Sequence, residues 1–214
     1  MNINNRKILV LAPHTDDLEF GCGATIAKLA EKERNNEIFC AAFSACKQSV
    51  RKEFPEDILI TEIKAASKIL GLKEENLRLF DYSVRTFNYQ RQELLDDILK
   101  LKYEIKPDLV FIPALTDLHQ DHFTIAQEGF RAFKFSSLLS YELPWNNLSF
   151  NTASFMKLED KHIETKIAAI KEYKSQAHRP YANAEFIKSL ARTRGVQINT
   201  HYAECFEVIR WILD

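Results

Sequence analysis

The 214-residue chain is 46% hydrophobic and 28% charged, a balance typical of a compact globular domain and unlike that of a disordered chain or a repeat array. Its 29 lysines and arginines against 30 aspartates and glutamates leave a formal net charge of -1. We therefore expect no overall electrostatic attraction to nucleic acid or to an anionic membrane.

Two features of the sequence bear on the compartment. The four cysteines form no C-x-x-C pair and lie in or beside apolar stretches, so we expect them to be reduced and mostly buried. The first apolar run, residues 8–12, is shorter than the apolar part of a secretory signal or a membrane-spanning helix. These features predict a soluble, cytoplasmic protein without stable membrane insertion.

Apolar runs of strand length alternate with stretches of helical periodicity along the chain. In chain order we predict strand 7–12, helix 24–34, strand 37–43, helix 61–70, strand 77–80, helix 93–103, strand 108–113, helix 124–133, strand 138–141, helix 161–173 and strand 205–212. Asp160 is the expected cap of the last helix, and residues 146–154 are an expected polar loop. The alternation predicts a single α/β domain over residues 1–214, with a mostly parallel sheet covered on both faces.

The first candidate cluster follows the first predicted strand. His14, Asp16 and Asp17 stand between that strand and the glycine-rich turn of residues 21–23, which is expected to open the first helix. In open α/β sheets, ligands bind at the carboxyl ends of the strands. These side chains therefore occupy a favoured position for a binding site.

A second cluster, His119-Gln120-Asp121-His122, follows the predicted strand 108–113 and precedes the helix predicted from residue 124. If the two strands are neighbours in the sheet, the two clusters meet. Imidazoles and carboxylates in such an arrangement are typical ligands of zinc, which in catalytic sites takes three protein ligands and a water. Asp16 and Asp121 have an ordinary alternative role as helix caps.

His14, His122 and one aspartate of the first cluster would supply the three ligands. The spacing leaves open which of Asp16 and Asp17 binds the metal and which accepts a proton from water. His119 is placed to stabilise an oxyanion or to protonate a leaving group, and Asp121 to orient a neighbouring imidazole.

At these residues the sequence resembles the LmbE-like, or PIG-L-type, zinc-dependent N-deacetylases. The family's AHPDD-type motif and following glycine-rich turn are matched by residues 14–17 and 21–25, and its H-x-D-H motif by residues 119–122. Residues 171–176 and 202–210 also look like the family's late helix and closing strand. The resemblance implies a Rossmann-like three-layer sandwich that removes acetyl groups from N-acetylglucosamine-type conjugates.

Residue roles follow from the same resemblance. It implies that His14, Asp17 and His122 bind one zinc ion, that Asp16 is the general base, and that His119 assists at the tetrahedral intermediate. Thr15 and Gln120 stand where the family commonly has proline, so the two loops have less backbone restriction than is usual in the family.

Arg85, after the third strand, and Arg194 are candidate residues for binding hydroxyl or acidic groups of a small sugar conjugate. Their alternative role is that of solvated surface arginines. The sequence does not identify the group attached to the sugar, and it leaves a homo-oligomer open.

Two other functions compete with deacetylation. A metal-dependent phosphoesterase also gathers Asp and His at strand ends, but it usually needs more carboxylate ligands for two metals. A non-catalytic sugar-binding protein of the same fold has no use for a poised base, which Asp16 would supply.

Overall fold

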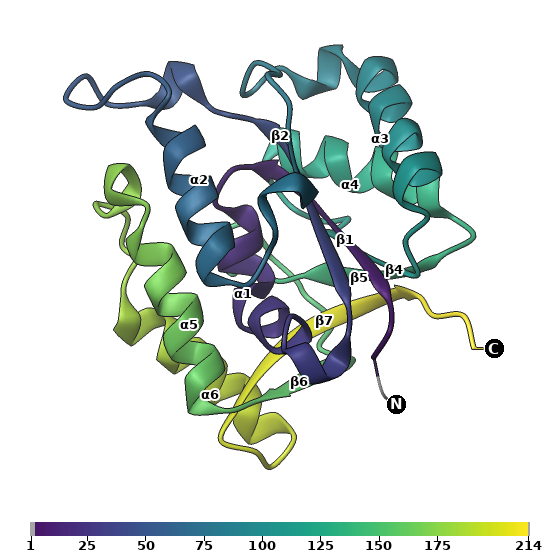
Figure 1. Ribbon diagram of the computed structural model, residues 1–214, viewed down its shortest axis with the longest axis vertical. Helices are drawn as coiled ribbons and strands as arrows, with labels where there is room; N and C mark the ends of the chain where they lie inside the picture. Colours follow the sequence, from purple (N-terminus) through teal and green to yellow (C-terminus); the bar gives the residue numbers. More distant parts are fainter. Residues whose placement is uncertain (1–2, 214) are drawn as a thin grey trace.

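A seven-stranded sheet of order β3-β2-β1-β4-β5-β7-β6 runs through the computed structural model, which describes residues 3–213 (Figure 1). Its strands are β1 (Lys7–His14), β2 (Glu37–Ser44), β3 (Leu77–Leu79), β4 (Leu109–Pro113), β5 (Ser137–Tyr141), β6 (Ser154–Leu158) and β7 (Tyr202–Arg210). Strands β1 to β5 pair in parallel, and β7 is antiparallel to both β5 and β6. The predicted α/β class with a mostly parallel sheet is confirmed.

Helices cover both faces of this sheet. They are α1 (Asp17–Leu29), α2 (Ile58–Ile69), α3 (Arg91–Ile105), α4 (Gln120–Phe133), α5 (Asp160–Lys171) and α6 (Ala184–Gln197). Helices α1, α2, α5 and α6 lie on one face, and α3 and α4 lie on the other (Figure 1). Strand β1 has apolar side chains on both faces, so both faces of the sheet need a cover of helices. Ile8 and Val10 pack on the side of α1, α2, α5 and α6, and Leu9 and Leu11 pack on the side of α3 and α4.

The order of the strands reverses direction between β1 and β4. Going from β1, the chain adds β2 and β3 on one side of the sheet, whereas β4 and β5 are added on the other side. The order therefore reverses between β1 and β4, which pair directly through Ile8 to Val10 and Leu109 to Phe111. Such a reversal is the usual ligand site of an open α/β sheet.

Helix α1 begins at Asp17 instead of residue 24, so the predicted start was wrong. The glycine-rich turn does interrupt this helix, because Cys22 has non-helical backbone angles (φ -147°, ψ 18°). Beyond the break, the amides of Ala24 and Thr25 donate to the buried carboxylate of Glu204, at 3.2 and 2.7 Å. The sequence pattern located the break but not the helical turn that precedes it.

Three other expectations need correction. Strand β6 begins at Ser154, the last residue of the predicted loop, and helix α6 was not predicted, because its buried stripe consists of only Ile187, Ala191 and Gly195. The cap of α5 is Glu159, whose side chain and backbone exchange hydrogen bonds with His162, and Asp160 is the first helical residue. The closing strand β7 spans residues 202–210, the range implied by the family resemblance, so it begins and ends earlier than the strand 205–212 predicted from the apolar pattern.

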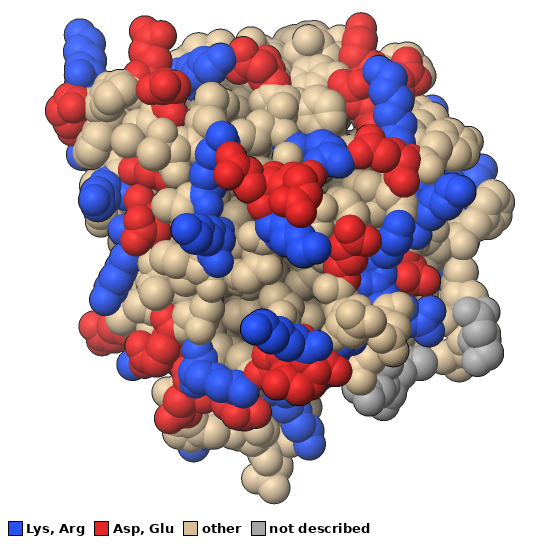
Figure 2. Space-filling view, in the orientation of Figure 1, with Lys and Arg blue, Asp and Glu red and all other residues tan. Residues whose placement is uncertain are grey.

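Four further features can be compared with the expectations from the sequence: the cysteines, the surface charges, membrane-spanning helices and the ends of the chain. Cys22, Cys40 and Cys205 are buried, Cys46 is half-buried, and all four are free. Lys and Arg side chains are interspersed with Asp and Glu on the face shown in Figure 2. Within residues 3–213, no helix is long and apolar enough to cross a membrane. Residues 1, 2 and 214, which the predicted domain includes, lie outside the described residues.

Candidate metal centre

The first cluster lies where β1 ends and α1 begins. His14 is the last residue of β1 and pairs with Ser44 of β2, which fixes the direction in which its side chain leaves the sheet. Asp17 opens α1, and its Oδ2 accepts the backbone amide of His14 at 2.7 Å. This contact closes the turn between strand and helix and holds the carboxylate of Asp17 beside the His14 imidazole.

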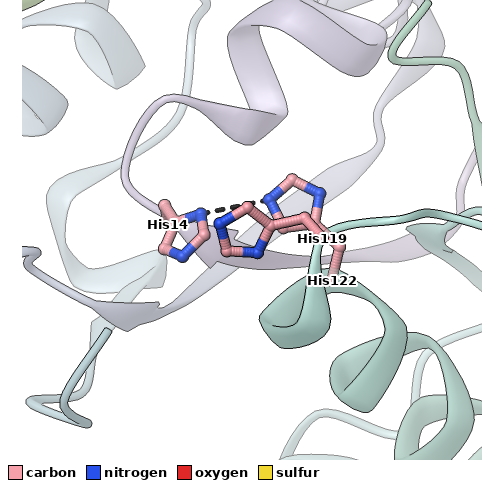
Figure 3. Close-up of side chains that lie close together, drawn as sticks. All are labelled: His14, His119 and His122. Carbon is pink, nitrogen blue, oxygen red and sulfur yellow. Dashed lines mark hydrogen bonds between the residues drawn. The ribbon is translucent and has the colours of Figure 1, made fainter. Parts of the chain in front are cut away.

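The second cluster opens α4, one strand further along the sheet. His119 caps this helix, and its Nδ1 accepts the amide of Asp121 at 3.2 Å. The amide of His119 in turn donates to Oδ1 of Asp117 at 2.8 Å. His122 follows within the first turn of α4, and its ring lies against the rings of His14 and His119 (Figure 3).

Three donor atoms from the two clusters form a small triangle. His14 Nδ1 lies 3.1 Å from His122 Nε2, and Asp17 Oδ2 lies 3.3 Å from the first atom and 3.4 Å from the second. Ligands that surround zinc tetrahedrally at about 2.0–2.1 Å are themselves about 3.3 Å apart. The triangle therefore has the dimensions of one face of a tetrahedral metal site.

A wider set of three imidazoles is also available. One ring nitrogen each of His14, His119 and His122 lie within 4.8 Å of one another. The donor atoms of the set containing Asp17 lie closer together, at 3.1–3.4 Å. In this set the second ring nitrogen of each histidine contacts a carboxylate oxygen. We therefore regard Asp17 as the better third ligand, while either set could hold a cation.

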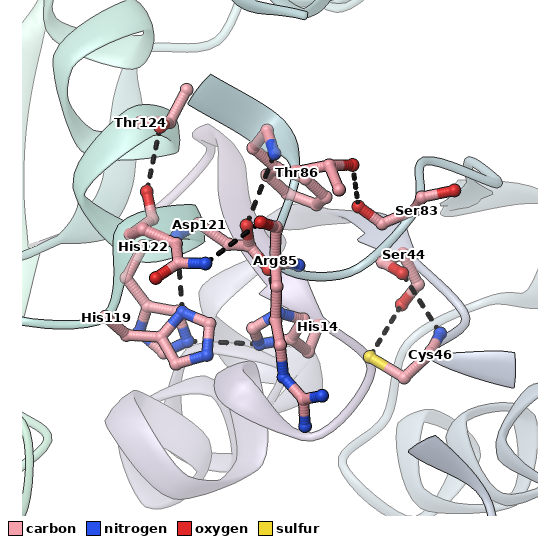
Figure 4. A network of polar contacts seen from close by, with 12 residues as sticks. His14, Ser44, Cys46, Ser83, Arg85, Thr86, His119, Asp121, His122 and Thr124 are labelled. Atoms are coloured by element: carbon pink, nitrogen blue, oxygen red, sulfur yellow. Dashed lines mark hydrogen bonds and ion pairs between the residues drawn. The ribbon is translucent and has the colours of Figure 1, made fainter. Parts of the chain in front are cut away.

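Outer carboxylates fix both imidazoles of the triangle. His14 Nε2 lies 3.0 Å from Oδ2 of Asp121 (Figure 4). His122 Nδ1 lies 3.0 Å from Oδ2 of Asp117. If these nitrogens carry the protons, His14 Nδ1 and His122 Nε2 present free lone pairs to the centre of the triangle. Metal-binding histidines typically have such an arrangement. Asp121 is fully buried and also accepts the amide of Arg85 at 2.6 Å.

The charges of the cluster indicate a place for a cation. Burial by itself lowers the pKa of His14, but the carboxylates of Asp121 and Asp17 outweigh it and raise this pKa well above its usual value. Burial likewise opposes ionisation of Asp17, yet the two imidazoles lower its pKa to about 2. Several buried carboxylates thus require positive charge at the triangle, which a divalent ion or a protonated imidazole supplies.

Two side chains face the same pocket without belonging to the triangle. Asp16 precedes α1 but makes no side-chain cap, and burial together with the neighbouring Asp17 raises its pKa. Burial and the imidazoles of His122 and His14 lower the pKa of His119 to about 4. Because Nδ1 of His119 accepts a backbone amide, its proton is on Nε2. The pocket therefore offers one carboxylate acceptor and one neutral N–H donor beside the triangle.

A cavity of about 290 Å³ contains these groups. Its wall includes a stacked aromatic pair, Trp145 and Tyr181, whose ring centroids lie 3.7 Å apart at an angle of 4°. Tyr181 was not identified from the sequence. Asp117 and the pocket residue Arg179 were also missed. For Asp117 a signal existed, because it stands two residues before His119 and five before His122.

The two predicted substrate-binding arginines lie in different places. Arg85 lines the cavity with His14 and Asp16. Arg194 pairs instead with Glu142 and donates to Gln197, and it lines a separate small cavity between α6 and β7. A substrate role for Arg194 remains a prediction.

Comparisons with known proteins identify the family of this chain. A family model described as PIG-L: GlcNAc-PI de-N-acetylase matches residues 9–133, which include both clusters. The uncharacterized deacetylase YaiS of Escherichia coli (strain K12) is 32% identical over 181 residues, covering 80% of this chain and 93% of YaiS. The chain therefore belongs to the PIG-L family of deacetylases, as the two motifs predicted.

Two solved structures show how widely the fold is used. The N,N'-diacetylchitobiose deacetylase of Pyrococcus horikoshii has a TM-score of 0.78 at 22% identity, covering 95% of this chain and 84% of that chain. GalB of Pseudomonas putida KT2440, a 4-carboxy-2-hydroxymuconate hydratase, also has a TM-score of 0.78, at 20% identity and 98% coverage of both chains. At these identities the likeness establishes the fold alone, so the reaction must be argued from the site.

Proposed function

We propose that residues 1–214 form one domain that hydrolyses the N-acetyl group of a small amino-sugar conjugate, releasing acetate and a free amine, with one zinc ion as cofactor. The observation that carries this proposal is the triangle of His14 Nδ1, Asp17 Oδ2 and His122 Nε2 beside the carboxylate of Asp16, which makes no capping hydrogen bond to α1. These three side chains would hold the metal. When bound, zinc polarises a carbonyl group and lowers the pKa of water to about 7.

The residues around the triangle supply proton transfer and orientation. Asp16 accepts a proton from the water that attacks the acetyl carbon, and its environment suits this task because its pKa is raised toward the working range of a base. The same carboxyl group returns that proton to the sugar nitrogen as the carbon–nitrogen bond breaks. Acetate and the amine are then the only products.

His119 stabilises the charge that develops on the acetyl oxygen. Burial and the imidazoles of His122 and His14 lower the pKa of His119 to about 4, which favours the neutral imidazole, and in this form its proton on Nε2 is a hydrogen-bond donor. Preorganised donors of this kind contribute about 10²- to 10³-fold to turnover. Asp121 acts through His14, whose ring it orients, and it does not touch the reacting atoms.

Purified protein loaded with zinc and incubated with N-acetylglucosamine conjugates tests the proposal. Acetate and primary amine should appear in equal amounts, and phosphate should not be released from p-nitrophenyl phosphate. Asp16→Asn should retain about one zinc per chain and lose most turnover. The exposed Asp96, on α3, gives a matched control, because Asp96→Asn removes the same charge away from the cavity.

Two results would reject the proposal. One is phosphate release without amine release, which would identify a phosphoesterase. The other is full turnover by Asp16→Asn, which would remove the proposed base.

A further inference from the structure

Two arginines on the cavity wall have no carboxylate partner within residues 3–213. Other arginines with polar contacts show the contrast: Arg91 and Arg131 share Glu128, and Arg194 pairs with Glu142. Arg85 and Arg179 form no such ion pair in the described part of the chain, yet both line the cavity of the metal centre. Their charges are therefore available to a ligand in that cavity.

The position of Arg85 is fixed from its backbone. Its φ of 68° lies in the left-handed region, which is unfavourable for a residue with a side chain and is common at functional sites. Its amide donates to Oδ2 of Asp121 at 2.6 Å, and its carbonyl accepts Nε2 of Gln120 at 2.9 Å. These contacts connect Arg85 to the carboxylate that orients His14. Figure 4 shows its guanidinium extending away from this network, without any of the dashed contacts.

Arg179 is held from its side chain. Its Nε donates to Oε1 of Gln176 at 2.6 Å, and one terminal nitrogen donates to the hydroxyl of Tyr181 at 2.7 Å. Both partners are neutral and both line the cavity, so the guanidinium is oriented but forms no ion pair with a carboxylate among residues 3–213.

We propose that Arg85 and Arg179 form an anion subsite beside the metal centre, so that the preferred substrate is an N-acetylated amino sugar carrying a phosphate or carboxylate group. Guanidinium groups without a carboxylate partner favour both anions, because their N–H donors match pairs of anionic oxygens. This inference rests on the proposed function, since it names the substrate class of the same site.

Matched substrates measure the preference. N-acetylglucosamine is compared with its 1-phosphate and 6-phosphate esters and with N-acetylmuramic acid, whose added group is a carboxylate. The kcat/KM of at least one anionic substrate should exceed that of the neutral sugar about 10- to 100-fold, the usual effect of hydrogen bonds to a charged group. The anionic substrate with the highest kcat/KM relative to N-acetylglucosamine shows whether the subsite prefers phosphate or carboxylate.

Variants then assign the preference to the two side chains. Arg85→Gln and Arg179→Gln should each reduce the ratio of anionic to neutral kcat/KM about tenfold, and the corresponding lysine variants should restore part of it. Arg192→Gln is the matched control, because Arg192 is an exposed α6 arginine outside the cavity lining. It should leave the ratio unchanged.

A binding measurement separates this inference from the proposed function. Calorimetry of the zinc-loaded protein compares glucosamine 6-phosphate and 1-phosphate with glucosamine, in the wild type and both glutamine variants. Acetate release with equal efficiency on neutral and anionic sugars would overturn the anion subsite while deacetylation stands. Phosphate affinity that neither variant reduces would also overturn it, because the metal alone would then bind the anion. Variant-sensitive phosphate binding without any acetate release would support the subsite and contradict the proposed reaction.

Discussion

Replacing Asp117 with asparagine tests the role of the outer carboxylates in the metal centre. Oδ2 of Asp117 lies 3.0 Å from Nδ1 of His122, and Oδ1 accepts the amide of His119 at 2.8 Å. Asparagine has one acceptor oxygen, so it keeps only one of these two contacts, and its amide nitrogen meets a second donor. The variant also loses the negative charge that favours the His122 tautomer with its proton on Nδ1.

Loss of such an outer carboxylate typically weakens metal binding about 10- to 100-fold, which corresponds to about 1.4–2.7 kcal/mol. Competition between the protein and a chromophoric chelator for zinc measures this change directly. Asp97→Asn is the matched control, because the carboxylate of Asp97, like that of Asp117, accepts two hydrogen bonds, but it lies on α3. A zinc Kd for Asp117→Asn within twofold of the wild-type value would refute our account of how His122 is positioned.

Three further results are expected. His119→Ala should lower kcat about 10²- to 10³-fold with little change in KM. His119→Gln keeps an N–H donor and should therefore recover part of this loss. Equal kcat values for the two variants would contradict the proposed donor role of His119. Burial raises the pKa of Glu19 from its ordinary value of 4.5 to about 8, so its carboxyl stays protonated in the native state and ionises in the unfolded one. The free energy of unfolding of the metal-free protein should therefore fall as the pH rises from about 4.5 to 8. Urea titrations should show a smaller fall for Glu19→Gln than for the wild type. The same fall in both proteins would contradict this role of Glu19. Lys166→Met should lower the free energy of unfolding by about 3–5 kcal/mol, because Lys166 and Glu204 form a buried ion pair with Nζ and Oε1 2.7 Å apart. The double variant Lys166→Met, Glu204→Gln should lose less unfolding free energy than the two single variants together. Strictly additive losses would argue against the pair.

The sequence was sufficient to locate both loops of the metal centre. His14 ends one strongly apolar strand and His122 comes after another, and strands of this kind are recognised from a short window of residues. Their pairing could only be assumed, because the β1–β4 contact depends on the order of strands in the sheet. That order is decided by the packing of the helices on both faces, which no local pattern records.

The rest of the cavity depended on contacts between distant parts of the chain. Arg179 and Tyr181 lie between α5 and α6 and reach the site only because these helices pack on the same face as α1. The start of α1 was missed for a related reason. The break at Cys22 is stabilised by Glu204 of β7, a partner far away in the sequence.

Anomalous diffraction from a crystal of the zinc-loaded protein tests the central claim most directly. We predict one zinc peak within about 2.0–2.2 Å of ligand atoms on His14, Asp17 and His122. Nδ1 of His14, Oδ2 of Asp17 and Nε2 of His122 should be those atoms, with His119 outside the bonding distance. A zinc ion bound by His119 in place of Asp17, or bound away from the triangle, would contradict the account.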